Sequence, residues 1–220
     1  MKKIIVVALA VITETTMAPG ASAATCERLP SAAFKVSVRE APVIVREDFS
    51  LSELNEMSAQ LRRPPAHPVY GFYAATVGYA LPRMKIPGER PATGNRVCPQ
   101  FSIAAELVAV DRRIEVAKDL SIVPCRLQAA IVHYQHHATA ASLALHRFAL
   151  ELPRTLAPNI YRYMQDHPKS SQVSKVALKK YVENRLSHAV KAFSASLVEV
   201  QAEVDSSSEI TTLLVPCDNT

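Results

Sequence analysis

The residues best placed to do chemistry are histidines that lie close together in the sequence: His133, His136, His137 and His146. His133 and His137 are four positions apart, so on a helix both imidazoles lie on one face, with Cβ atoms about 5–6 Å apart. Two imidazoles at this spacing can share one Zn²⁺. The same helix would direct His136 and His146 elsewhere. The spacing therefore indicates a candidate metal site at His133 and His137.

This run of residues lacks two parts of a hydrolytic zinc site. In an HExxH motif the residue after the first histidine is a glutamate that takes a proton from zinc-bound water, and here it is Tyr134. A phenol with an ordinary pKa near ~10 is a poor general base at neutral pH. Nor does a third ligand stand at an obvious spacing, because Glu151 shares roughly the same face but lies about 20 Å further along the helix axis. The pair could also be polar residues on a partly solvated flank.

Other catalytic arrangements find little support in the sequence. The glycines at positions 20, 71, 78, 88 and 94 frame no serine in a GxSxG turn, and no glycine-rich loop could cradle a phosphate. A general base could still come from another segment, for example from Glu106 or Glu115. An active hydrolase of that kind is one alternative.

Residues 1–23 have the order of a cleavable secretory signal peptide. Lys2 and Lys3 precede an apolar stretch, which is followed by Ala21-Ser22-Ala23. The apolar stretch is shorter than the roughly 20 residues that span a bilayer, so we expect no stable membrane insertion after processing. The mature chain would begin near Ala24 and work in a bacterial periplasm or the surrounding medium.

The charge pattern bears on the class of partner. The whole chain has a formal net charge of +5, but its basic pairs are scattered and have no interleaved aromatic residues. Nucleic acid is therefore not an expected partner. A protein or peptide partner is left open.

The cysteines Cys26, Cys98, Cys125 and Cys217 all follow the expected cleavage site. In an oxidising compartment an even number of cysteines indicates disulfides. The sequence contains no CxxC pair, so the cysteines do not point to a structural zinc site. Three connectivities are open. We favour Cys98–Cys125, between a strand start and a helix start, with Cys26–Cys217 joining the two ends of the chain.

Hydrophobic periodicity predicts strands in the first half of the chain and two long helices in the second. Such an order indicates an α+β fold, with a small antiparallel or mixed sheet packed on two long helices, in a single domain over residues 24–220. Pro153 is expected to stop the first long helix, and Asp111-Arg112 to lie at or near a turn between two strands. The expected strands are 34–39, 43–46, 71–81, 101–110 and 113–116; the expected helices are 50–61, 124–152, a short piece at 158–166, and a long helix with its apolar stripe over 178–204.

Several of these features together resemble a group of bacterial secreted proteins that are classed as predicted zinc-dependent proteases. The matching pieces are the signal peptide, Ser50–Leu54, Gly71–Tyr79, Cys98, Cys125, the run His133–His137 and the tail from Val204 to Cys217. The resemblance implies a zincin-like fold in which His133 and His137 are the zinc ligands. It also implies that Tyr134 has replaced the catalytic glutamate.

The sequence thus favours an exported, zincin-like protein, a catalytically degenerate metallopeptidase homologue that could still bind Zn²⁺ through its histidine pair. The alternative is a non-enzymatic, metal-free periplasmic or secreted protein with a binding or structural role.

Overall fold

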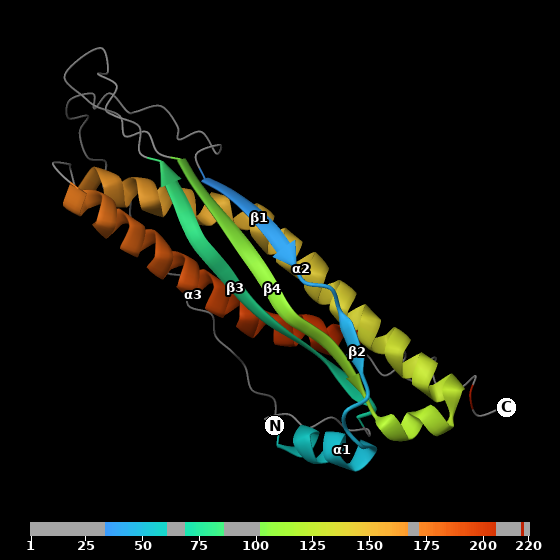
Figure 1. Cartoon of the computed structure of the whole chain (residues 1–220). Helices are drawn as coiled ribbons and strands as arrows, with labels where there is room; N and C mark the ends of the chain where they lie inside the picture. Colours follow the sequence, from blue (N-terminus) through green and yellow to red (C-terminus); the bar gives the residue numbers. More distant parts are fainter. Residues whose placement is uncertain (1–33, 61–68, 86–101, 167–171, 206–216, 218–220) are drawn as a thin grey trace, which may run out of the picture.

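The computed structural model describes residues 34–60, 69–85, 102–166, 172–205 and 217 (Figure 1). All of its strands precede the two long helices, so the α+β class expected from the sequence is confirmed. In chain order the elements are β1 (Phe34–Glu40), β2 (Ile44–Arg46), α1 (Leu51–Ala59), β3 (Gly71–Lys85), β4 (Ser102–Val116), the 3₁₀ helix η2 (Lys118–Ile122), α2 (Pro124–Asp166) and α3 (Gln172–Val204).

The sheet is open and mixed, with β4 at its centre. Along one edge of β4, β1 and β2 pair with it in parallel, with Val38 opposite Leu107 and Val45 opposite Ile114. Along the other edge, β3 pairs with β4 in the antiparallel direction. Of the two sheet types expected from the sequence, the structure therefore has the mixed one.

One continuous strand stands where two strands and a turn were expected, so that prediction was wrong. β4 passes through Asp111 and Arg112 with a bulge, in which these two residues oppose the single residue Ala75 of β3. Asp111 has φ of 52°, a left-handed conformation that aspartate tolerates better than most residues. The extra residue shifts the inward-facing positions by one along the strand. Arg112 therefore lies on the face that packs against α2.

The first long helix is also longer than expected, because α2 continues through Pro153 and Pro158 to Asp166. A proline inside a helix typically costs about 3 kcal/mol, since it removes a backbone hydrogen bond and its ring clashes with the preceding turn. Here the turns beyond Pro153 bury Leu156 and Ile160 in the core, and this burial offsets the cost. The predicted stop at Pro153 was therefore wrong.

The core lies between the sheet and the long helices. Its larger part joins β1 and β4 to α2 and α3, with Phe34, Leu107, Leu152 and Leu186 almost fully buried. A smaller part lies at the α1 end of the sheet, and its buried members are Leu54, Ile114, Val116, Ala117, Leu120, Ala130 and Tyr134. Figure 1 shows α2 and α3 running together along the sheet.

A disulfide joins Cys125, at the start of α2, to Cys217. The favoured pairings Cys98–Cys125 and Cys26–Cys217 were therefore wrong. Their physical basis was weak, because sequence separation does not reveal which ends the fold brings together. Cys26, Cys98 and the proposed signal peptide lie outside the described residues. Within those residues, no helix combines the length and the apolar character that a membrane crossing needs.

Candidate metal centre

The histidine pair lies on α2, eight and twelve positions after the helix-opening Cys125. Both residues are buried, His133 at 7% exposure and His137 at 5%. Their Nε2 atoms lie 3.1 Å apart, because the four-residue spacing sets one ring above the other on the same helix face. The shared face predicted from the sequence is confirmed, although burial shows that it is not a solvated flank.

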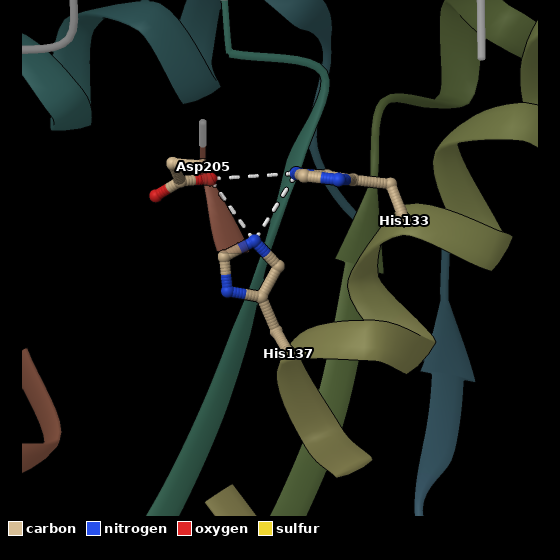
Figure 2. A group of neighbouring side chains, drawn as sticks. All are labelled: His133, His137 and Asp205. Carbon is tan, nitrogen blue, oxygen red and sulfur yellow. Dashed lines mark hydrogen bonds and ion pairs between the residues drawn. The ribbon is translucent and has the colours of Figure 1, made fainter. Parts of the chain in front are cut away.

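The carboxylate of Asp205 is the third group of the cluster, and it comes from the far end of α3. Asp205 follows the last residue of α3, and its Oδ1 lies 3.4 Å from His133 Nε2 and 3.0 Å from His137 Nε2. Figure 2 shows the three side chains converging from the two helices. Sequence spacing missed this ligand, because only the antiparallel packing of α3 on α2 brings Asp205 to the histidines. In the sequence alone, Asp205 was singled out only as part of the tail from Val204 to Cys217, which resembles the tail of the secreted zinc-dependent proteases.

The three atoms form a triangle whose size suits a small metal ion. In a tetrahedral site with metal–ligand distances of about 2.0–2.1 Å, two ligand atoms are about 3.3 Å apart. The observed edges of 3.0, 3.1 and 3.4 Å lie close to that value. His133, His137 and Asp205 could therefore hold a metal ion with little movement.

His137 has a partner on each ring nitrogen. Its Nδ1 lies 2.5 Å from Oε1 of Gln201, and Nε2 of Gln201 donates to the backbone oxygen of His137 at 3.4 Å. When Nδ1 carries the proton and donates it to Gln201, the lone pair of Nε2 faces Asp205. A partner of this kind fixes the tautomer that a metal needs. His133 differs, since its Nδ1 has no hydrogen-bond partner among the described residues.

The electrostatics of the cluster favour an ionised Asp205. Burial alone would raise the pKa of its carboxyl group, but hydrogen bonds from His133 and His137, and the positive charge that these rings carry when protonated, outweigh burial. The pKa of Asp205 is therefore held well below its usual range. A carboxylate that stays ionised and two imidazoles form a donor set that attracts a divalent cation.

Tyr134 comes directly after His133 and packs against both histidines of the site. Its ring stacks on His137, with centroids 5.6 Å apart, and meets the edge of His133 at 4.9 Å. Burial raises the pKa of the phenol well above its usual range, and the charge of Asp205 raises it further, although a hydrogen bond with the Gly71 backbone acts in the opposite direction. Tyr134 therefore keeps its proton at neutral pH.

The other candidate bases lie elsewhere. Glu106 pairs with Arg39 at 3.2 Å on the sheet. Glu115 is buried and pairs with Arg113 at 3.3 Å, while its neighbours on β4 pack in the cluster that contains Tyr134. Since adjacent strand residues point to opposite faces, Glu115 faces away from α2. Neither carboxylate is positioned to act at the histidine pair.

The other two histidines of this stretch do not join the site, as expected from their positions on the helix. His136 is exposed, and His146 lies 3.8 Å from Glu40, further along α2.

Comparison with known proteins does not place the chain in a family. No protein-family model, curated protein or solved structure matches it. Any functional conclusion therefore depends on the geometry of the site.

Proposed function

We propose that this chain is an exported zinc-binding protein, related to secreted zinc-dependent proteases, whose site has lost its general base. One observation carries the proposal: His133 Nε2, His137 Nε2 and Asp205 Oδ1 form a triangle with edges of 3.0 to 3.4 Å. Those edges match a tetrahedral zinc site better than a site for a larger cation, whose ligands lie further apart.

The choice of zinc follows from the donor atoms. Two imidazoles and one carboxylate suit Zn²⁺, whereas Mg²⁺ and Ca²⁺ prefer oxygen ligands alone. Three protein ligands leave one coordination position for a small ligand, an arrangement typical of zinc sites that do chemistry. When bound, zinc would supply a Lewis acid at that position.

Loss of hydrolysis is proposed from the residues around the site. A zinc peptidase needs a base to remove a proton from the attacking water. Tyr134 keeps its proton, and Glu106 and Glu115 pair with arginines away from the site. We therefore expect the protein to bind zinc without cleaving peptides.

Export is supported by two features. One is the signal-like order of residues 1–23, and the other is the Cys125–Cys217 disulfide, a bond that persists mainly in oxidising compartments. The resemblance to secreted zinc-dependent proteases points the same way.

The proposal is tested by the metal content of the mature protein, purified without a histidine tag and measured by elemental mass spectrometry. We expect about one zinc per chain, lost in the His133→Ala/His137→Ala variant. The matched control is His136→Ala, which removes an exposed histidine from the same helix turn and should keep the zinc. If the wild type takes up no metal after zinc loading, the protein is instead a metal-free binding or structural protein.

A further inference from the structure

A groove runs between β2 and α2, on the flank of α2 opposite the metal centre. It is open to solvent, has a volume of about 460 Å³, and is lined by the apolar residues Val45, Ile114 and Leu143 and by one charged residue, Arg112. Volumes of this size are typical of small-ligand sites. At about 100° per residue, the α2 positions that line the groove lie across the helix from His133 and His137. The groove is therefore separate from the metal centre.

Arg112 reaches this groove because of the bulge in β4. Its side chain is 10% exposed. Its Nε donates a hydrogen bond to the hydroxyl of Tyr73, and its Nη1 donates to the carboxylate of Glu40 and to the backbone oxygen of Ala41. The described residues offer no hydrogen-bond partner to Nη2. Nη2 is not one of the fully buried side-chain atoms that lack a partner, so it reaches the surface of the groove, where a ligand oxygen can bind it.

The other polar groups of the groove limit which ligand groups it can bind by hydrogen bonds. Ser142 donates its proton to Glu40, and Thr139 donates its proton to the backbone oxygen of Gln135. Neither hydroxyl is then available as a donor. Glu40 pairs with Nη1 of Arg112 and accepts the hydrogen bond of Ser142, and it is not among the residues that line the groove. An acceptor oxygen of a ligand would therefore be bound by Arg112; the groove is also lined by Gln135.

The walls of the groove add an apolar requirement. Val45 is 42% exposed and Leu143 is 55% exposed, so both leave aliphatic surface at the rim that a ligand could cover. From these observations we infer that the groove binds a small aliphatic carboxylic acid. The carboxylate binds Nη2 of Arg112, and the hydrocarbon chain lies between β2 and α2.

The test uses octanoate, with octanol and octylamine as probes of the same chain length, in calorimetric titrations of the mature protein. Octanoate should bind, each further methylene from butanoate upward should tighten binding by about two- to fourfold, and octanol should bind at least about tenfold more weakly. Octylamine should not bind. Equal binding of octanoate and octanol, or no binding of octanoate at millimolar concentration, overturns the inference.

Variants locate the ligand. Thr139→Trp fills the groove from its exposed rim and should weaken octanoate binding at least about tenfold, whereas Leu150→Trp, at an exposed position of α2 outside the groove, should leave binding unchanged. The double variant Arg112→Gln/Glu40→Gln removes both charges together, so that no charge is left buried alone, and should abolish the preference for octanoate over octanol. Full binding by the Thr139→Trp protein would contradict the inference.

A last arm separates the groove from the metal centre, because a carboxylate could also bind zinc. Octanoate should bind the His133→Ala/His137→Ala variant as it binds the wild type. Loss of binding in that variant would place octanoate on the metal and overturn the inference, without affecting the proposed zinc site.

Discussion

At the residue scale, the central feature is the different support of the two histidines. His137 is held on Nδ1 by Gln201, while Nδ1 of His133 has no partner among the described residues. A fixed tautomer presents its lone pair to the metal at no further cost. His137 is therefore the better-oriented ligand, and Gln201 is the residue that positions it.

Replacing Gln201 tests this role. Gln201→Leu removes the acceptor for the Nδ1 proton, and we expect the zinc affinity to fall about 10–100-fold, as measured by competition with a chelator of known affinity. Gln201→Glu keeps an acceptor at the same place and should retain most of the affinity. An unchanged affinity in Gln201→Leu would show that Gln201 does not position His137.

The ligand set illustrates what single residues reveal. The four-residue spacing of His133 and His137 was enough to predict their shared face, because helix geometry is local. Asp205 could not be found in this way, since its place beside the histidines depends on how α3 packs. Its sequence environment, a helix end followed by serines, predicted only a helix terminus.

At the element scale, the start of β3 sets the position of the histidine helix. A Cβ on Gly71 would lie 2.2 Å from the backbone oxygen of Glu115 and 2.6 Å from Cε2 of Tyr134. The backbone oxygen belongs to β4 and cannot move aside easily, so β3 would have to shift away from β4 and from the Tyr134 ring on α2. Only glycine allows this close approach between the strand and the ring that stacks on His137.

Gly71→Ala therefore should lower the free energy of unfolding by at least about 2 kcal/mol, measured by urea denaturation, and should weaken zinc binding through Tyr134. Gly78→Ala is the matched control on the same strand, because its new Cβ would meet only Val108 Cγ2 at 3.7 Å. If both variants were equally stable, the close approach at Gly71 would not be a constraint.

Glu115 of β4 gives a prediction for pH dependence. Burial raises its pKa and the charge of Asp48 adds to this, while Arg113 and Arg46 act against it. The folded protein thus holds this proton more tightly than the unfolded chain does, so ionisation costs stability as the pH rises above the ordinary value of 4.5. Below that value the cost is not incurred.

Glu115→Gln should therefore remove this part of the pH dependence, so that the free energy of unfolding falls less between about pH 4 and pH 7 than in the wild type. The zinc content should not change, because Glu115 faces away from the site. A variant that lost its zinc would instead connect Glu115 to the metal centre.

The errors in element prediction have a common origin. Asp111 and Pro153 are local signals for a turn and a helix end, and both are overruled by packing. The pairing of β4 with β3 continues on both sides of the bulge, and the turns of α2 after Pro153 bury apolar side chains. Apolar periodicity predicted the elements well, because it reflects burial directly.

At the scale of the whole molecule, the Cys125–Cys217 disulfide joins residues that are 92 positions apart. The loop that it closes contains nearly all of α2, the whole of α3, and the three candidate metal ligands His133, His137 and Asp205. Cross-linking a loop of this length restricts the unfolded chain and typically stabilises a protein by several kcal/mol. The pairing could not be predicted, since four cysteines allow three connectivities and the fold decides among them.

The double variant Cys125→Ser/Cys217→Ser should lower the free energy of unfolding by about 2–5 kcal/mol, measured by urea denaturation. Peptide mapping of the non-reduced wild type should recover the peptides of Cys125 and Cys217 joined to each other. Recovery of Cys125 joined to Cys98 would contradict the pairing and the placement of the chain end.

The most direct test of the account is a crystal of the mature protein soaked in zinc and measured at the zinc absorption edge. We predict one strong anomalous peak about 2.0–2.2 Å from His133 Nε2, His137 Nε2 and an oxygen of Asp205. A peak bound by other residues, or no peak at this triangle with zinc in excess, would contradict the claim that these three residues form a metal centre.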